Sequence, residues 1–368
     1  MSEADSADPR ERLMSGASWE EFCDTLKNAG KTIVAEGQPD GPLDRAEGYR
    51  YLSRLTRAAL ETFVEYSDPL APVLNRPVHE TAKIGADNPD NYYQHATISG
   101  AHDYLIRGKR NTIRYLDFAT QSAGVASSGD SEQGGHLDTS NLEMDPEGGF
   151  TIRLSCEETP GNWLRMTPDT TALIVRQTFA DRESEIPASL SIERIGGDGR
   201  PAQFTPEALD AGLGQAAGLV ASCAALFSNW AQGFQDHTNE LPKFDDAVSM
   251  GAGGDPNICY YHSYWSLGPE EALVIEATPP ECDAWNFQLD NHWMESLDYR
   301  FHKIHVNKHT AVYQDDGSIR IVVAHRDPGV PNWIETAGHA QGTMCFRWIR
   351  AEAHPQPQCR VVKFSELR

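Results

Sequence analysis

The chain has 368 residues, of which 39% are hydrophobic, so it is long enough for two modest domains or one large β architecture with a helical cap. With 54 acidic and 31 basic residues the formal net charge is −23, which disfavours binding to nucleic acids and to anionic lipids. The seven cysteines form no C-x-x-C pair, which excludes zinc ribbons and thioredoxin-type chemistry and favours free thiols in the cytoplasm. We find neither a secretory signal nor a long uninterrupted apolar run, and therefore expect no membrane span.

The sequence divides into five predicted parts. They are a disordered tail at 1–17, a helical region at 18–80, a first β-rich part at 81–200, a long helix at 201–240, and a second β-rich part at 241–368 that carries the candidate site. Ser18 and Glu21 form a capping-box pattern that predicts the start of the first helix. Apolar residues at helical spacing predict a second helix from about Leu43 to Tyr66 and the long helix from about Pro206 to Gln235.

Short stretches rich in β-branched and aromatic residues, separated by turn residues, predict strands in both β-rich parts. They cover Tyr92–Ser99, His102–Arg107, Thr112–Phe118, Phe150–Ser155, Thr171–Phe179, Ala188–Ile195, Ile258–Trp265, Ala272–Thr278, Ala284–Asp290, Thr310–Tyr313, Ser318–His325 and Thr343–Arg350. The Gly-, Ser- and Asp-rich segment 122–147 predicts a loop or a hairpin tip. The predicted fold class is α+β, with a helical N-terminal region followed by a mainly antiparallel, jelly-roll-like β-sandwich and one long inserted helix. Whether the β portion forms one sandwich or two stays open.

Several longer segments carry a resemblance to a known family. They are 87–93 (DNPDNYY), 104–108 (YLIRG), 287–293 (FQLDNHW), 316–318 (DGS) and 325–333 (HRDPGVPNW). Together they resemble the domain-of-unknown-function 1214 family in its shorter bacterial form, and the N-terminal segment is also similar to the partner domain often fused ahead of it. The resemblance covers most of the chain and implies a jelly-roll-like β fold. It implies little chemistry, because the family is named for its unknown function, and its pattern supplies no catalytic residues.

The predicted strand Ile258–Trp265 offers the first candidate site residues. Alternation places Tyr260, His262 and Tyr264 on one face of this strand. That face is either a pocket with an imidazole for proton transfer and two phenols for binding, or a core face whose polar tips are satisfied.

A second candidate group follows the predicted strand Ala284–Asp290. His292 suits proton transfer if a carboxylate such as Glu295 fixes its tautomer, and Trp293 would line the pocket. The alternative is a turn in which Asp290 and Asn291 satisfy local backbone groups.

Three further histidines raise the question of a metal. His302, His305 and His309, with Glu295 or Asp298, have spacings that face one way on a helix. This segment looks extended or irregular, which scatters the rings, and no H-E-x-x-H motif is present. We therefore expect no metal and no cofactor.

The segment 325–333 is a loop stiffened by two prolines and a glycine. It would hold Asp327 for proton transfer, Asn332 for stabilising negative charge and Trp333 for lining the pocket. Downstream, His339 is a further proton-transfer candidate and Arg347 could clamp an oxyanion. The alternative is a structural loop in which Asp327 caps backbone amides and Trp333 fills the core.

These residues favour an enzyme that acts on a small organic molecule, an apolar ring or a sugar-like compound, by cofactor-free acid/base chemistry. Hydrolysis, elimination or isomerisation would each fit. The first alternative is a non-catalytic binding protein for a hydrophobic metabolite or glycan, and the second is a structural protein. No nucleophile elbow, Walker loop or dinucleotide fingerprint occurs in the sequence. The expected partner is a small-molecule substrate, without nucleic acid or membrane, and assembly into a homo-oligomer stays open.

Overall fold

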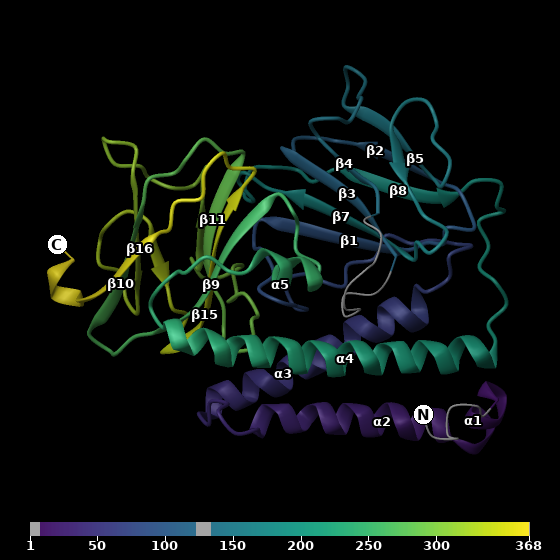
Figure 1. Cartoon of the computed structure of the whole chain (residues 1–368), viewed down its shortest axis with the longest axis horizontal. Coiled ribbons are helices and arrows are strands. Elements are labelled where there is room, and N and C mark those ends of the chain that lie inside the picture. Colours follow the sequence, from purple (N-terminus) through teal and green to yellow (C-terminus); the bar gives the residue numbers. More distant parts are fainter. Residues whose placement is uncertain (1–7, 123–133, 368) are drawn as a thin grey trace. The chain divides into compact units, whose positions relative to one another are not determined.

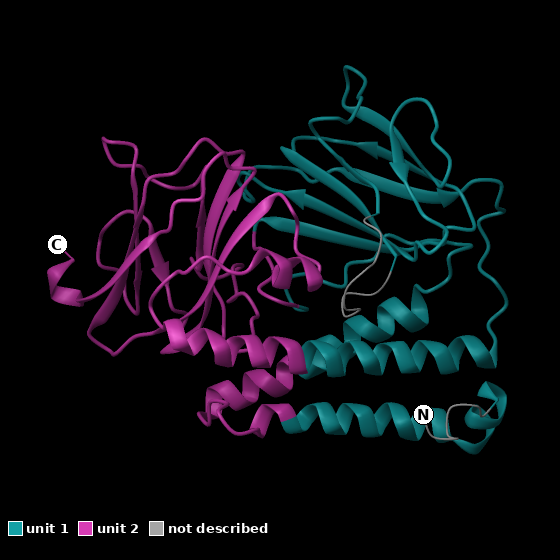
Figure 2. Cartoon of the chain, in the orientation of Figure 1, with its two compact units in different colours: residues 1–31, 52–82, 90–224 teal, residues 32–51, 83–89, 225–368 magenta. Residues whose placement is uncertain are grey.

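The computed structural model describes residues 8–122 and 134–367. The chain forms two compact units, coloured separately in Figure 2. Unit 1 comprises 1–31, 52–82 and 90–224, and unit 2 comprises 32–51, 83–89 and 225–368. Each unit is therefore assembled from three separate segments of the sequence.

The helices gather in the N-terminal region and in one long element (Figure 1). They are α1 (Pro9–Ser15), α2 (Ala17–Ala29), α3 (Pro42–Leu60), α4 (Pro206–Phe234) and α5 (Asp246–Gly251), with short helical turns at Gly30–Val34, Glu61–Glu65, Gln235–His237 and Phe364–Glu366. Of the tail expected at 1–17, residues 1–7 lie outside the described residues. From residue 9 the structure has helix α1 in place of the expected disorder. Helix α1 forms because Asp8 accepts a hydrogen bond from the backbone N–H of Arg10 and a proline occupies its first turn.

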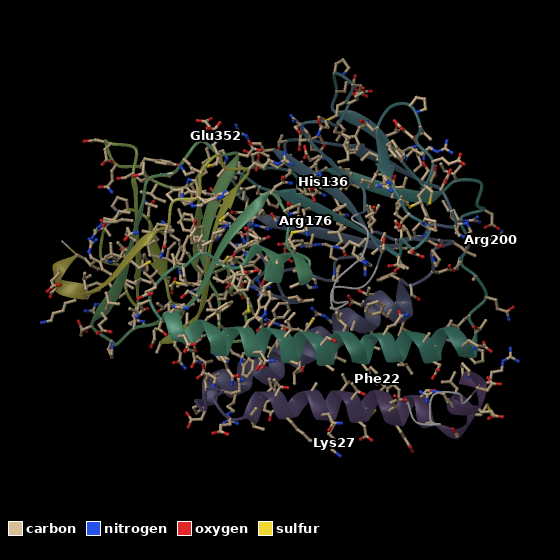
Figure 3. All side chains as sticks on the ribbon, in the orientation of Figure 1. Phe22, Lys27, His136, Arg176, Arg200 and Glu352 are labelled. Atoms are coloured by element: carbon tan, nitrogen blue, oxygen red, sulfur yellow. The ribbon has the colours of Figure 1, made fainter. Side chains whose placement is uncertain are left out.

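Helix α2 begins two residues earlier than its capping pattern indicates. Its N-cap is Gly16, and Ser18 lies inside the first turn. The hydroxyl of Ser18 bonds the carboxylate of Asp210 at 2.5 Å, so a tertiary contact replaces the expected local cap. The amphipathic character of the helix is as predicted, because Phe22 is buried while Lys27, one turn further on, is exposed (Figure 3).

Helix α4 is the long helix that the sequence predicts. By length and composition alone the segment Pro206–His237 is apolar enough to cross a membrane. An 18-residue window within it has a mean hydropathy of 1.4, and 50% of that window is buried inside the protein. A helix in the core of a globular protein passes the same test, so this composition is weak evidence for a membrane segment.

Unit 1 contains two four-stranded sheets, ordered β1-β7-β3-β4 and β6-β5-β2-β8. The strands are β1 (Asn91–Thr97), β2 (Tyr104–Lys109), β3 (Tyr115–Gln121), β4 (His136–Asp138), β5 (Gly149–Ser155), β6 (Trp163–Arg165), β7 (Ala172–Thr178) and β8 (Ser189–Arg194). Apolar side chains from both sheets, among them Phe118, Ile106 and Val175, form one buried cluster. Pairing is antiparallel except between β5 and β6.

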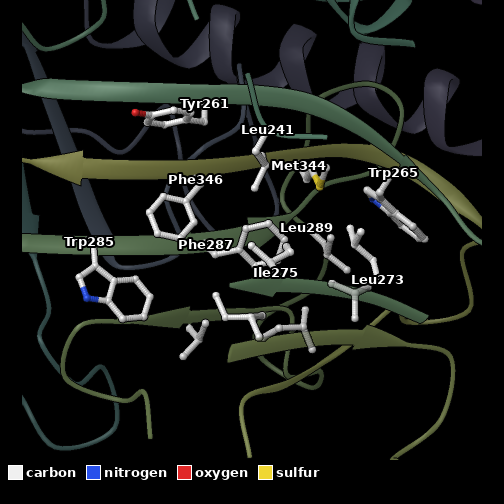
Figure 4. Packing of buried hydrophobic residues seen from close by; sticks show 14 of the residues in the cluster. Leu241, Tyr261, Trp265, Leu273, Ile275, Trp285, Phe287, Leu289, Met344 and Phe346 are labelled. Carbon is white, nitrogen blue, oxygen red and sulfur yellow. The ribbon is translucent and has the colours of Figure 1, made fainter. Parts of the chain in front are cut away.

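Unit 2 also contains two four-stranded sheets, ordered β12-β11-β15-β9 and β14-β13-β10-β16. The strands are β9 (Ile258–Ser266), β10 (Glu271–Ala277), β11 (Ala284–Leu289), β12 (His305–Asn307), β13 (Ile319–Ala324), β14 (Trp333–Glu335), β15 (Gln341–Ile349) and β16 (Gln358–Lys363). Side chains from both sheets meet in one apolar cluster, in which Trp285, Phe287 and Phe346 lie close together (Figure 4). The class is thus α+β with one long helix and largely antiparallel sheets.

The strands that the sequence missed are mostly short. They are β4, β6, β12, β14 and β16, of which β4 lies in the segment expected to be a loop. Part of that segment, 123–133, lies outside the described residues. Conversely, Thr310–Tyr313 forms no strand, and Tyr313 makes only an isolated bridge to Ile319. A three-residue strand depends on its neighbours in the sheet and leaves little periodicity in the sequence.

Candidate functional site

The β12-β11-β15-β9 sheet of unit 2, which we call the site sheet, has two contrasting faces. Antiparallel register aligns Gln288 with Cys345 and Cys345 with His262, so these side chains share a face. This polar face carries Asn286, Gln288, Asp290, Thr343, Cys345, Arg347, Tyr260, His262 and Tyr264. The opposite face supplies Trp285, Phe287, Leu289, Met344, Phe346, Trp348, Tyr261 and Trp265 to the apolar cluster. The alternation predicted for the strand from 258 is therefore confirmed.

The polar side chains of this face are buried inside the protein. Asn286, Gln288 and Asp290 are each at most 1% exposed, and Arg347 is 4% exposed. Burying polar and charged groups is unfavourable unless they are paired, so such a concentration needs either dense hydrogen bonding or a functional reason.

Arg347 is held by neutral oxygens. One guanidinium nitrogen donates to Oε1 of Gln288 at 2.6 Å and to Oδ1 of Asn286 at 3.2 Å, and the other donates to the backbone oxygen of Ala86 at 2.6 Å. The guanidinium also lies over the ring of Tyr260, 5.8 Å from its centroid. These contacts join 83–89 to the site sheet and fix Arg347 in place, so the oxyanion clamp expected for it is already engaged by protein groups.

Asp290 is only partly satisfied by hydrogen bonds. Its Oδ1 accepts a hydrogen bond from Nε2 of Gln288 at 2.5 Å, whereas Oδ2 has no partner among the described residues. Burial raises the pKa of Asp290 to about 8, and the nearby charge of Asp87 adds to the effect. Asp290 is therefore predominantly a neutral carboxyl group at pH 7.

His262 lies in an aromatic cluster. Its ring is stacked with those of Phe234 and Tyr260 and meets that of Phe244 edge to face, with centroids 5.6, 5.5 and 5.2 Å away. Its Nδ1 has no hydrogen-bond partner in the part of the chain that the structure describes, and its Nε2 lies 3.9 Å from Sγ of Cys345. Burial lowers the pKa of His262 to about 3, so the ring is neutral. Burial also raises the pKa of Cys345 to about 12, so the two do not form a thiolate–imidazolium pair.

A cavity of about 360 Å³ opens beside His262. Its walls come from the end of helix α4, from the loop and helix α5 that follow it, and from β9. The lining includes the aromatic residues Trp230, Phe234 and Phe244, together with His262 and, among the polar side chains, Lys243. Trp230 and Phe244 are 4.9 Å apart at their centroids and inclined at 63°, so the apolar walls are rigid aromatic surfaces.

His292 is fully bonded to the protein. Its Nε2 lies 2.7 Å from Oε1 of Gln38, and its Nδ1 lies 3.0 Å from the hydroxyl of Tyr264. Gln38 is itself oriented by donating to the hydroxyl of Ser228 at 2.7 Å, which assigns the proton to Nε2 of His292. Burial lowers the pKa of His292 to about 4. This histidine therefore joins 32–51 to the site sheet, and Glu295 is not its partner in these contacts.

His339 does have a carboxylate partner. Its Nε2 lies 3.0 Å from Oε2 of Glu47, and its Nδ1 lies 3.1 Å from the backbone oxygen of Thr336. Burial alone would lower the pKa of His339, but the hydrogen bond and charge of Glu47 outweigh it and the pKa is raised. Glu47 also accepts a hydrogen bond from Arg50, so the pair belongs to a small ionic cluster at the start of α3.

The structure does not bring the residues of the loop 325–333 to the polar face. The carboxylate of Asp327 accepts a hydrogen bond from the backbone N–H of Gly329 at 2.7 Å and is exposed. Asn332 bonds both backbone groups of Val312, at 2.8 Å each, with a positive φ of 53°. Trp333 donates to the backbone oxygen of Ala324. These residues form turns and pack beside the other sheet of unit 2. The segment 325–333 is therefore a structural loop, which was the alternative interpretation of its sequence.

Trp293 also has a packing role. Its Nε1 donates to the backbone oxygen of Asp44 at 2.8 Å. Its ring lies so close to Gly48 of α3 that a Cβ there would be 2.8 Å from two of its ring atoms. Trp293 therefore fixes the start of α3 against the site sheet.

The three histidines considered for a metal do not gather into one site. His302 pairs with Glu335 at 3.0 Å, and the ring of His305 meets that of Tyr299 edge to face. Within the described residues, no group of three ligating side chains includes His302, His305 or His309.

Sequence reasoning missed the residues that come from other segments. Gln38 and Glu47 reach the site from the N-terminal helical region, and nothing in their local pattern distinguishes them from surface residues. Trp230 and Phe234 lie in the predicted long helix, but the helix pattern does not mark them as cavity residues. Asp290 has a sequence signal, because it stands at the end of a predicted buried strand, where functional side chains often project.

A family model and two solved structures are similar to this chain. The family model described as "Protein of unknown function (DUF1214)" matches residues 272–353. A crystal structure of an uncharacterised protein from Burkholderia cenocepacia is 51% identical with a TM-score of 0.93, covering 97% of this chain and 99% of that chain. A crystal structure of a Vibrio parahaemolyticus protein is 14% identical with a TM-score of 0.50, covering 86% of this chain and 98% of that chain, and it shows the fold alone. None of the curated proteins compared matches the chain.

Proposed function

We propose that unit 2 of this chain, which belongs to the DUF1214 family, binds a small organic molecule with a planar ring in the cavity beside His262. The observation that carries this proposal is a cavity of about 360 Å³ with aromatic walls, next to a buried imidazole whose Nδ1 has no partner among residues 8–122 and 134–367. Small-molecule sites commonly combine such walls with a few polar groups.

The residues support binding of a flat and largely apolar group. Trp230 and Phe244 offer ring faces and edges inclined to one another, which suits a planar guest in an edge-to-face or offset arrangement. Burying such a guest contributes about 25 cal/mol for each Å² of apolar surface removed from water. A sugar ring offers less apolar area, so we favour an aromatic or otherwise flat hydrophobic ring.

Acid/base chemistry on the bound molecule is a second candidate, favoured by one observation. Asp290 and His262 lie on the same face of the site sheet, and each has a polar atom without a partner among the described residues. Their protonation states are opposite to those of isolated side chains near pH 5, since Asp290 keeps its proton and His262 has none. Such divergent environments are typical of an acid and a base acting together. Hydrolysis, elimination and isomerisation would each use this pair.

Fragment binding tests the first proposal. Ligand-observed NMR would compare phenol with cyclohexanol, which share a hydroxyl group but differ in planarity. We expect phenol to bind more tightly, and His262→Phe to weaken phenol binding by removing the hydrogen-bonding imidazole while keeping a ring in the stack. Equal binding of both compounds, unaffected by changes in the cavity, would contradict the proposal.

Isotope exchange tests the second. Fragments that bind and carry an acidic C–H bond would be incubated in deuterium oxide with the wild type, His262→Phe and Asp290→Asn. Acid/base chemistry predicts exchange in the wild type and its loss in both variants, each measured at a fragment concentration that saturates that variant. Binding without exchange would leave only the binding role.

We further propose that the two sheets of unit 2 form a jelly-roll-like sandwich. The support is the single apolar cluster to which both sheets contribute. We propose the same for unit 1, whose sheets also share one cluster. A cytoplasmic location is a proposal that rests on the cysteine pattern. The proposal that neither nucleic acid nor membrane is a partner rests on the acidic composition, and the proposed partner is a small molecule.

A further inference from the structure

We propose that the ligand of the cavity carries an anionic group as well as a planar ring, so that aromatic carboxylates are its chemical class. This inference rests on the proposed binding function and adds the charge of the ligand. Its basis is the placement of Lys243 at a cavity whose lining contains no acidic side chain among the described residues.

The charged residues of the cavity lining differ from those of the chain as a whole. The chain has 54 acidic and 31 basic residues, so a randomly chosen patch of surface is expected to contain more acidic than basic groups. The cavity instead carries Lys243 and His237 beside the aromatic rings. A positive group next to an apolar slot is suited to a ring that carries a carboxylate.

Lys243 is held in position at the cavity. Its Nζ donates to Oδ2 of Asp246 at 2.8 Å, and this hydrogen bond and the charge of Asp246 raise the pKa of Lys243, which keeps it charged. The neighbouring Asp245 is engaged elsewhere, because its carboxylate caps helix α5 at the backbone N–H of Val248. A ligand carboxylate at Lys243 would therefore compete with the carboxylate of Asp246 for hydrogen bonds from Nζ.

Two features of the site oppose an anion. The cavity lies at the C-terminal end of α4, where the helix dipole amounts to roughly half a negative charge. Asp246 also pairs with Lys243, so a ligand carboxylate has to share the ammonium group with it. We favour an anion because the lining itself holds Lys243 and no carboxylate among the described residues, even though aromatic walls by themselves also suit cations.

The test uses probes matched in ring and different in charge. Binding of benzoate, benzamide and benzyltrimethylammonium to the full-length protein would be measured by NMR at pH 7. We expect benzoate to bind about fivefold more tightly than benzamide, because a partly exposed ion pair contributes about that much. We expect benzyltrimethylammonium to bind more weakly than either. Preference for the cation, or equal binding of benzoate and benzamide, would overturn the inference.

Two variants with opposite expected effects sharpen the test. Lys243→Met keeps an aliphatic chain of similar length and should weaken benzoate about fivefold while leaving benzamide unchanged. Asp246→Asn removes the competing carboxylate and should tighten benzoate binding. Both residues are largely exposed, so the fold should tolerate each change. If both variants bind benzoate as the wild type does, the anionic class is wrong.

A further variant, Gly233→Leu, separates this inference from the proposed function, because Gly233 lines the cavity. If all three probes bind with equal affinity and Gly233→Leu abolishes their binding, the cavity binds rings without regard to charge, and only the inference fails. If no ring-bearing probe binds, both the proposed function and the inference fail.

Discussion

The imidazole of His262 and the ring of Phe234 lie nearly parallel, with centroids 5.6 Å apart and planes inclined by 3°. This stack joins the end of α4 to β9 and contributes to the burial of the histidine, which is 6% exposed. A charged imidazolium would have to lose its hydration there without a carboxylate to compensate it. The relationship therefore explains why burial lowers the pKa of His262 to about 3.

The first prediction is a change in acid stability in His262→Phe. In the wild type the unfolded chain takes up a proton at a pH near 6.5 and the folded chain only near 3, so this group destabilises the fold as the pH falls through that interval. The variant lacks this term, so its stability relative to the wild type should rise by at most about 1.4 kcal/mol for each pH unit below 6.5. Urea unfolding at pH 7, 6 and 5 measures it, and identical pH dependence in both proteins would contradict it.

The second prediction has the opposite sign. The folded-state pKa of Asp290, about 8, exceeds its unfolded value, so the contribution of this group to stability is complete below about pH 4 and is lost as the pH rises towards 8. Asp290→Asn keeps the shape and removes the ionisation. Its stability relative to the wild type should therefore increase between pH 5 and pH 8, by as much as a few kcal/mol. Chemical denaturation across this range would show a constant difference if Asp290 were ionised in the folded protein.

The third prediction concerns the pair of His339 and Glu47. Because the folded-state pKa of His339 is raised, the pair stabilises the fold below about pH 6.5 and loses that effect as the pH rises through the folded-state pKa. Glu47→Gln keeps a hydrogen-bond acceptor but removes the charge. We expect it to destabilise the protein by roughly 1–3 kcal/mol at pH 6 and by less at pH 9. NMR titration of His339 in the two proteins should show a lower pKa in the variant, and an unchanged pKa would contradict the assignment.

The fourth prediction tests the close approach of α3 to Trp293. A Cβ at Gly48 would lie 2.8 Å from two ring atoms of Trp293 and 2.7 Å from a methyl group of Ile33. Gly48→Ala should therefore destabilise the protein by about 1–3 kcal/mol, because the tryptophan is packed and cannot move aside. The matched control is Gly218→Ala in α4, where the added Cβ meets nothing within 4 Å and should stabilise the helix by about 1 kcal/mol. Thermal unfolding that ranks the two variants equally would contradict the packing described.

Much of the fold could be predicted from periodicity. The strand from 258 alternates between polar and core side chains as expected, and helix α4 ends one residue before its predicted end at Gln235. These elements are long, and each has a face that must be buried, so their pattern is strong. The prediction of a disordered tail was wrong for the residues that form α1. A helix this short depends on the cap at Asp8 and on tertiary contacts, which leave little pattern in the sequence.

The candidate site could be predicted only in part. Tyr260, His262 and Tyr264 share a face because strand geometry requires it. Asp327 and Asn332 looked equally promising, but their spacing also fits the Asx-type bonds to nearby backbone groups that they make. Local sequence cannot distinguish these uses. The pairing of His292 with Gln38 depends on tertiary structure across more than 250 residues, and no local pattern encodes it.

The most direct test of the central claim is to fill the cavity. Gly233 lines it, and a Cβ added at Gly233 meets no atom within 4 Å, so Gly233→Leu should occupy the cavity without straining the helix. Gly218→Leu, in the same helix and equally open, is the matched control. Binding of phenol to the wild type and both variants would be measured by NMR. We predict that Gly233→Leu abolishes binding and Gly218→Leu preserves it, whereas equal binding by all three proteins would contradict the assignment of the cavity as the ligand site.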